Sequence, residues 1–219
     1  MSFTVAIFGA SGATGTLLTQ RCLSAGYLVQ VLVRNPGEYS LAHRVQVVRG
    51  DVRDNFAVRQ TVAGADVVLS ALGARSWGKE DVLEDGIPNI LAAMKRHSAL
   101  HGPVRRIIAL GSAGALEDSL DLQPAWRRWI VKNIVYKTFL KWPVASQVAQ
   151  YKLLAASDLD WTMVMPPMLT NGRARGTYRV DGRALPRNGS SISRADVADF
   201  MFAQIHSDTW VRKGVYISD

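Results

Sequence analysis

A glycine-rich loop near the start of the chain constrains its possible folds more than any other feature. Glycines recur at every third position, at Gly9, Gly12 and Gly15. They follow an apolar run, Val5–Phe8, and open an amphipathic segment, Ala13–Ala25. A strand, a tight glycine loop and a helix in this order form the dinucleotide fingerprint of a βαβ unit. The loop therefore predicts a parallel sheet with a nucleotide bound at its edge.

The three glycines have separate tasks in such a loop. Gly9 permits the tight turn off the strand, Gly12 lets a pyrophosphate approach the backbone, and Gly15 lets the helix pack closely on the sheet. The first turn of the predicted helix carries no acidic side chain, so its N–H groups remain available for an anion. We assign cofactor contacts to Gly9, Ser11, Gly12, Ala13, Thr14 and Gly15. A glycine-rich turn without a ligand is the alternative.

Beyond the loop, short apolar runs alternate with helix-length amphipathic segments. The runs are apolar enough to be strands buried on both faces, and the segments are long enough to cross over a sheet. The predicted strands are Val5–Phe8, Val29–Val33, Val45–Val48, Val67–Ala71, Ile107–Leu110 and Trp161–Met165. The predicted helices are Ala13–Ala25, Asn55–Val62, Asp81–His97 and Val144–Ser157. This alternation predicts an α/β fold, a doubly wound parallel sheet of the Rossmann type.

The alternation ends after Met165, where the sequence becomes rich in glycine and arginine. The segment Gly176–Arg179 alternates in polarity, and Ser193 with Asp196 forms a capping box that opens a last helix reaching about Ile205. A chain of 219 residues fits one domain. We predict a single NAD(P)-binding Rossmann domain over 1–219, in which 166–219 form a small substrate-side appendage.

Composition narrows the class of protein further. Hydrophobic residues make up 48% and charged residues 20%, which excludes disordered and collagen-like classes. No stretch reaches 18 apolar residues, and a strand-like run begins at Phe3, so we expect a soluble cytoplasmic protein without a transmembrane segment. The single cysteine, Cys22, falls in a helix pattern, where we expect it to pack, and no Cys/His spacing predicts a metal site.

The charge is basic and concentrated in the C-terminal half. Lys and Arg number 26 against 18 Asp and Glu, a net charge of +8. A solvated basic face and an anionic partner both explain this excess, and charge alone does not decide between them. No nucleic-acid recognition motif accompanies the charge, so we expect no nucleic-acid partner.

Arg34 points to the phosphorylated form of the cofactor. It closes the second predicted strand, about 20 residues after the loop, where an NAD site has an acidic residue for the ribose 2′-hydroxyl. An acid would repel a 2′-phosphate, whereas the planar guanidinium can hold it by two charge-assisted bonds. Arg34 therefore favours NADPH over NADH, with a solvated arginine at a strand end as the alternative.

Two further strand ends lie at the edge where ligands bind in open parallel sheets. Asp51 and Val52 follow the third strand, and Leu72 and Gly73 follow the fourth. Asp51 can accept a hydrogen bond from the adenine amino group, with Val52 against the ring, or it can be a helix N-cap. We assign all four residues to the cofactor site.

Several motifs together resemble a known family. They are Gly9–Gly15, Ala25-Gly26-Tyr27, Val31-Leu32-Val33-Arg34, Gly50-Asp51-Val52, Thr61-Val62-Ala63-Gly64, Asn89–Lys95, Ser112-Ala113, Val164-Met165-Pro166-Pro167 and Asp181-Gly182-Arg183. Across nearly its whole length the chain resembles the atypical short-chain dehydrogenases/reductases, in particular the flavin and biliverdin reductases. The resemblance implies NADPH as cofactor and hydride transfer to a flavin, a quinone-like dye or a linear tetrapyrrole. Related members are non-enzymatic redox sensors or co-regulators, so the fold alone does not establish activity.

The resemblance also implies where the reacting end lies. The family serine at the position of Ser112 lies beside the nicotinamide and the acceptor, and Pro166 and Pro167 place backbone groups beside the nicotinamide. A loop or cap role is the alternative for Ser112. Tyr151 stands where the flavin reductases have a histidine, so it is our second catalytic candidate, with ordinary packing as the alternative.

The usual catalytic pair of short-chain dehydrogenases is missing. No tyrosine is followed by a lysine four residues later, which argues against alcohol dehydrogenation by a Tyr-x-x-x-Lys mechanism. A conjugated acceptor needs less from the protein, because it delocalises the transferred charge and takes its proton from water. Positioning is then the main task.

Two more departures from the family concern charge and aromatic residues. Glu38 is acidic where the resembling reductases have a second basic residue, so NADPH selectivity rests on Arg34, with His43 or Arg44 as substitutes. The segment 124–143 predicts a basic helix rich in tryptophan. Core packing is the favoured role for its aromatic side chains. A wall of the acceptor site and a membrane-surface face are the alternatives.

The sequence thus supports two hypotheses of different classes. The first is an NADPH-dependent reductase of flavins, quinones or tetrapyrrole-like acceptors. The second is an NADP(H)-binding sensor or regulatory protein without turnover. The oligomeric state is open, with a monomer favoured.

Overall fold

The computed structural model describes residues 2–73, 82–96, 102–131, 133 and 141–219. A large sheet forms the middle of the molecule, in the order β3-β2-β1-β4-β5-β6-β10-β8. Its strands are β1 (Thr4–Phe8), β2 (Leu28–Val33), β3 (Gln46–Arg49), β4 (Val67–Ser70), β5 (Arg106–Leu110), β6 (Asp160–Met165), β8 (Arg179–Asp181) and β10 (Lys213–Ser218). All neighbours pair in parallel except β8, which runs antiparallel to β10. The predicted doubly wound sheet is confirmed.

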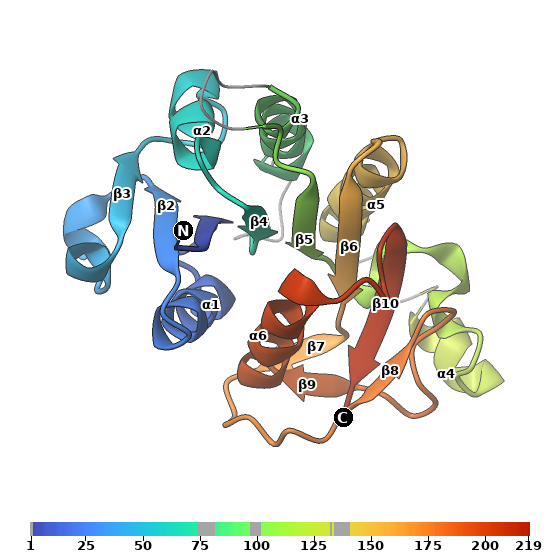
Figure 1. Ribbon diagram of the computed structural model, residues 1–219. Helices are drawn as coiled ribbons and strands as arrows, with labels where there is room; N and C mark the ends of the chain where they lie inside the picture. Colours follow the sequence, from blue (N-terminus) through green and yellow to red (C-terminus); the bar gives the residue numbers. More distant parts are fainter. Residues whose placement is uncertain (1, 74–81, 97–101, 132, 134–140) are drawn as a thin grey trace.

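Helices cover both faces of this sheet (Figure 1). They are α1 (Ala13–Ser24), α2 (Asn55–Val62), α3 (Val82–Met94), α4 (Ala125–Ile130), α5 (Lys141–Ala155) and α6 (Arg194–Ala203). On one face α2, α3 and α5 pack side by side, and on the other α1 packs against α6. The strands supply both cores by alternation: Ala6 and Phe8 of β1 face the first layer, and Val5 and Ile7 face the second.

The direction of winding reverses beside β1. The chain builds β2 and then β3 on one side of β1, and β4, β5 and β6 on the other. Ile7 of β1 therefore lies between Val31 of β2 and Leu69 of β4. Helices leave this point toward opposite faces, which opens a crevice outside the carboxyl ends of the strands.

Cys22 belongs to the core between α1 and the sheet. Its side chain is fully buried, and burial raises the pKa of its thiol to about 12. The predicted packing role of this residue is confirmed.

The C-terminal part contains strands that the sequence analysis missed. β10 extends the large sheet beyond β6, and β7 (Met168–Thr170) pairs in parallel with β9 (Ser191–Ser193) in a separate small sheet. The alternating segment Gly176–Arg179 is mostly loop, because Gly176 adopts a positive φ of 67° and β8 begins only at Arg179. The predicted capping box is confirmed at the start of α6, where Ser193 Oγ accepts a hydrogen bond from the N–H of Asp196 at 2.9 Å.

Core packing, the favoured role of the tryptophan-rich segment, was wrong for Trp126 and Trp129. Trp126 is 68% exposed and Trp129 is 61% exposed, so neither packs in the core. α4 ends at Ile130, and Trp142 belongs to the first turn of α5. Residues 132 and 134–140 of the predicted tryptophan-rich helix lie outside the described residues.

No helix in the described part of the chain has both the length and the apolar character that a membrane span requires.

Candidate cofactor site

A cavity of about 450 Å³ opens at the carboxyl edge of the sheet, beside β1. It gathers segments that follow four neighbouring strands. Its lining residues are Gly9, Ser11, Gly12, Ala13, Thr14, Leu32, Val33, Arg34, Gly50, Asp51, Val52, Arg53, Ala71, Leu72, Gly73, Val82 and Arg194. Most of the cofactor residues expected from the sequence therefore lie around one cavity. Gly15, Pro166, Pro167, Ser112 and Tyr151 do not line it.

The loop after β1 has the steric requirements predicted for a phosphate loop. Gly9 has a φ of +76°, and a Cβ atom there would lie 2.6 Å from the carbonyl oxygen of Ala71. A Cβ atom on Gly15 would overlap the carbonyl oxygen of Gly9. Gly15 is therefore buried beneath the loop, where it allows the helix to approach, and Gly12 remains at the cavity surface.

The N-terminus of α1 faces this cavity, and none of the described residues places a neutralising group there. Its N-cap is Gly12, no side chain caps it, and its first turn has no acidic residue. The first backbone N–H groups of a helix lack intrahelical partners, and the helix dipole adds positive potential there. This end of α1 is suited to an anion such as a pyrophosphate.

Three charged side chains form a cluster at the ends of β2 and β3. Nη1 of Arg34 lies 3.9 Å from a carboxylate oxygen of Asp51, and Nη1 of Arg53 lies 3.6 Å from the other oxygen. Arg53 also pairs with Asp85 of α3 at 3.1 Å. The cluster places two guanidinium groups around one carboxylate at the cavity wall.

Asp51 is not the N-cap of α2, which was one of its two predicted roles. That position belongs to Asp54, whose carboxylate accepts hydrogen bonds from the N–H groups of Phe56 and Ala57 at 2.8 and 3.3 Å. Asp51 instead accepts a bond from the N–H of Arg53 at 3.0 Å and stays beside the cavity.

The loop after Arg34 provides no other cation to the cavity. Glu38, His43 and Arg44 are exposed, and none of them lines it. The second cation is Arg53, which sequence reasoning missed although it directly follows Gly50-Asp51-Val52. The order of residues gave a usable signal here, because the loop that carries Asp51 and Val52 to the cavity must also carry its next residue there.

Apolar side chains form the wall next to this cluster. Val52 and Leu72 are buried with part of each surface on the cavity. α3 approaches Val52 closely at Gly86, where a Cβ atom would lie 2.7 Å from a methyl carbon of Val52, and Asn89 donates a hydrogen bond to the Val52 carbonyl at 2.9 Å. A flat aromatic group such as adenine fits against an apolar wall of this kind.

The ends of β5 and β6 are tied together. The N–H of Ala113 donates to the carbonyl of Pro166 at 2.8 Å, which places the Ser112 loop beside the two prolines. Ser112 also caps a short 3₁₀ helix, Ala113–Ala115, with its Oγ accepting a long bond of 3.4 Å from the N–H of Gly114. The cap role proposed as an alternative is therefore present in the structure.

Tyr151 lies in α5, and its ring packs edge-on against Trp161, with ring centres 5.6 Å apart. It also borders Gly214 of β10, where a Cβ atom would come within 3.3 Å of the tyrosine ring. These contacts account for the half-buried ring by packing.

Arg194 is a lining residue that sequence analysis did not identify as part of the site. It is the first residue of α6, and its Nη1 donates to Asn171 Oδ1 at 2.6 Å and to the Leu169 carbonyl at 3.3 Å. From the sequence, its motif Ser193-Arg194-Ala195-Asp196 predicts only the start of a helix.

Among the described residues, no group of three or more His, Cys, Asp or Glu side chains could hold a metal ion.

Comparisons with known proteins agree with this geometry. The sequence matches the NAD(P)H-binding family over residues 9–208. It is similar to reductase pytE of Aspergillus terreus, with 26% identity over 96% of this chain and 92% of that protein. Other curated relatives are longer, and the chain spans 10% to 56% of the length of several of them.

Solved structures share the fold along the whole chain. A short-chain dehydrogenase/reductase from Veillonella parvula DSM 2008 in complex with NADP has a TM-score of 0.78 and 21% identity, covering 100% of this chain and 95% of that one. An anaerobillin reductase from Escherichia coli O157:H7 has a TM-score of 0.77 and 19% identity, covering 98% and 96%. The structural resemblance to short-chain dehydrogenases/reductases is confirmed.

Proposed function

Because the chain belongs to the NAD(P)H-binding family, we propose that it is an NADPH-dependent reductase that passes hydride to a conjugated acceptor. The acceptor class is a flavin, a quinone or a linear tetrapyrrole. The observation that carries the proposal is the single cavity shared by the open N-terminus of α1, the apolar wall at Val52 and the guanidinium of Arg34. These three features match the pyrophosphate, the adenine and the 2′-phosphate of NADPH in that order.

The direction of the bound cofactor follows from these assignments. With the adenosine at the ends of β2 and β3 and the pyrophosphate at α1, a dinucleotide continues across the crevice toward β5 and β6. Ser112, Pro166 and Pro167 follow those strands, and we assign them to the nicotinamide end. Residues 166–219 would then border the acceptor. NADPH, when bound, supplies the hydride.

The protein's own task is positioning. Ser112 would orient the nicotinamide or the acceptor by a hydrogen bond, and the backbone at Pro166 and Pro167 would hold the carboxamide. Tyr151 is the second candidate for hydrogen bonding or proton supply at the acceptor. Tyr151→Phe keeps the ring against Trp161 and removes only the hydroxyl, so a fall in kcat would support that assignment and an unchanged kcat would leave Tyr151 a packing residue.

A specific observation favours a second candidate function, an NADP(H)-binding sensor without turnover. Ser112, Tyr151, Pro166 and Pro167 do not line the described cavity, so its residues support nucleotide binding more directly than acceptor binding. A sensor must bind the oxidised and reduced nucleotides with different affinities, because only a difference in affinity can shift a conformational equilibrium.

Rapid mixing separates the two functions. The NADPH complex is mixed with FMN, quinone dyes and linear tetrapyrroles, and oxidation is followed against a protein-free control. Oxidation above that control with at least one acceptor is the expected result. No oxidation with any of them, together with unequal affinities for NADP⁺ and NADPH, would replace the reductase with the sensor.

A further inference from the structure

We propose that Arg194 binds the pyrophosphate of the dinucleotide, as a cation that the C-terminal part of the chain supplies to the N-terminal phosphate loop. The inference rests on the proposed cofactor site and extends it. Arg194 is half-buried and lines the same cavity as Gly9, Gly12 and Thr14. It reaches that cavity because α6, which it begins, packs against α1.

The charge of Arg194 has no carboxylate partner in the described part of the chain. Its guanidinium donates to two neutral oxygens, Asn171 Oδ1 at 2.6 Å and the Leu169 carbonyl at 3.3 Å. Of the described arginines that line the cavity, the other two, Arg34 and Arg53, are both close to Asp51. Among these described lining arginines, Arg194 is therefore the one whose charge is left for a ligand.

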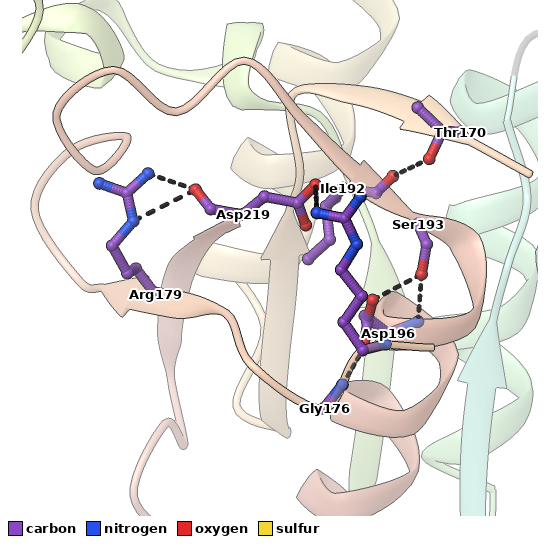
Figure 2. Close-up of polar contacts among 8 residues, drawn as sticks. Thr170, Gly176, Arg179, Ile192, Ser193, Asp196 and Asp219 are labelled. Carbon is purple, nitrogen blue, oxygen red and sulfur yellow. Dashed lines mark hydrogen bonds and ion pairs between the residues drawn. The ribbon is translucent and has the colours of Figure 1, made fainter. Parts of the chain in front are cut away.

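The two helices that meet at this edge differ in how their first turns are satisfied. At α6, Ser193 Oγ accepts a bond from the N–H of Asp196, and the Asp196 carboxylate accepts one from Ser193 Oγ at 2.6 Å. That buried carboxylate also accepts bonds from the N–H groups of Arg175 and Gly176, both at 2.9 Å. Figure 2 shows Ser193 and Gly176 meeting Asp196 in this way. At the start of α6, the protein's own carboxylate, that of Asp196, thus occupies the place of an anionic ligand.

In the described part of the chain, the start of α1 has no such anion. Gly12 caps it without a side chain, and the first turn is free of acidic residues. An anion at this cavity therefore meets unpaired helix N–H groups from α1 and a guanidinium from the first residue of α6. Arginine binds phosphate oxygens through paired, charge-assisted N–H donors.

The pyrophosphate is the group that this arrangement selects. It lies between the adenosine, which we place at Val52 and Arg34, and the nicotinamide, which we place near Ser112. It is also common to NAD and NADP. Loss of Arg194 should therefore weaken both nucleotides by the same factor, whereas loss of Arg34 should weaken mainly NADP.

Calorimetric titration with NADP⁺, NAD⁺ and adenosine 2′-monophosphate tests the assignment. In Arg194→Gln, we expect the Kd of both dinucleotides to rise about tenfold or more, the effect of losing a charged hydrogen-bonding partner. The affinity for adenosine 2′-monophosphate should stay unchanged, since that ligand carries the 2′-phosphate without a pyrophosphate. Arg194→Lys, which keeps the charge, should recover part of the dinucleotide affinity.

Two control variants separate ligand binding from net charge and from folding. Arg173→Gln removes the same charge from an exposed position outside the cavity. Asn171→Ala removes the 2.6 Å partner of Arg194 and leaves its charge in place. Both should bind the two dinucleotides as the wild type does. The thermal unfolding transition of each variant, compared with that of the wild type, is the check that the variant is folded.

Each result decides the assignment. Equal dinucleotide affinity in the wild type and Arg194→Gln would overturn it, as would an equal loss in Asn171→Ala, which would make Arg194 a structural residue. A loss confined to NADP⁺ would move Arg194 to the 2′-phosphate and overturn it too. Failure of every acceptor to oxidise NADPH, with the predicted affinity losses intact, would reject the reductase and keep Arg194 at the pyrophosphate.

Discussion

Arg34 and Asp51 lie across one edge of the candidate cofactor cavity, with Nη1 of Arg34 3.9 Å from a carboxylate oxygen of Asp51. The site that should receive a 2′-phosphate therefore already contains a negative charge of the protein. Both side chains are partly exposed, 49% and 33%, so their mutual attraction is weak and a phosphate can compete for the arginine.

Neutralising Asp51 should raise the preference for NADPH. In Asp51→Asn, the repulsion between the carboxylate and a 2′-phosphate disappears, and the affinity ratio of NADPH to NADH should rise by up to about fivefold, the range for a partly exposed charge pair. Asp85→Asn is the matched control, because Asp85 also pairs with Arg53 but does not line the cavity. A fall in the ratio would contradict the placement of the 2′-phosphate beside Asp51.

Reversing the charge at Arg34 should have the opposite effect. Arg34→Asp removes the guanidinium and adds repulsion, so NADPH binding should lose about 1.5 to 3 kcal/mol, while NADH loses much less. Calorimetry with both nucleotides measures the difference. Arg44→Asp makes the same charge change at an exposed residue outside the cavity. It should leave both affinities at their wild-type values. Equal losses for both nucleotides in Arg34→Asp would remove Arg34 from the 2′-phosphate site.

Ser112 should act on the acceptor step and not on cofactor binding. Ser112→Ala should lower kcat/KM for flavin or dye reduction and keep the NADPH affinity, because the residue follows β5 and lies outside the cavity that we assign to the adenosine half. The lost helix cap is a long bond of 3.4 Å, so thermal stability should change little. Weaker NADPH binding with unaltered turnover at saturation would make Ser112 a cofactor residue.

Trp129 should affect the KM of a flat acceptor. Its side chain is 61% exposed on α4, so Trp129→Ala costs no core packing, and loss of stacking should raise the KM for FMN or a quinone by about two- to tenfold. The affinity for NADPH should not change. Phe56→Ala, which removes an aromatic side chain of equal exposure from α2, is the control. An unchanged KM in Trp129→Ala would separate α4 from the acceptor site.

Cys22 should make the protein less stable at high pH. Burial raises the pKa of its thiol from 9.0 to about 12, so above the lower value the unfolded chain releases this proton and the folded chain keeps it. The associated stability is complete below about pH 9 and declines as the pH rises toward 12, by up to about 1.4 kcal/mol per pH unit. Urea unfolding between about pH 7 and about pH 10.5 should show a steeper decline for the wild type than for Cys22→Ala. Parallel declines would mean that the thiol ionises as easily in the folded chain as in the unfolded one.

Local patterns sufficed for much of this molecule. The geometry of the glycine loop after β1 was predictable because the tight turn at Gly9 and the close approach at Gly15 exclude side chains. The first six parallel strands were predictable from their apolar runs. Five of them are largely buried on both faces of the sheet, and β3, at its edge, is only partly buried. The capping box of Ser193 and Asp196 was also predictable from local sequence, because its two partners are only three residues apart.

Features that depend on distant segments were decided only by the tertiary structure. The sequence contained Arg194, but its place in the cavity arises from the packing of α6 on α1, which no local period encodes. Arg34 and Arg53 both approach the carboxylate of Asp51. This cluster forms only because the ends of β2 and β3 lie side by side. The exposure of Trp126 and Trp129 likewise depends on what packs against α4. The hydrophobic period of a sequence specifies which residues share one face of a helix or strand. Whether that face is buried depends on which distant segment of the chain packs against it.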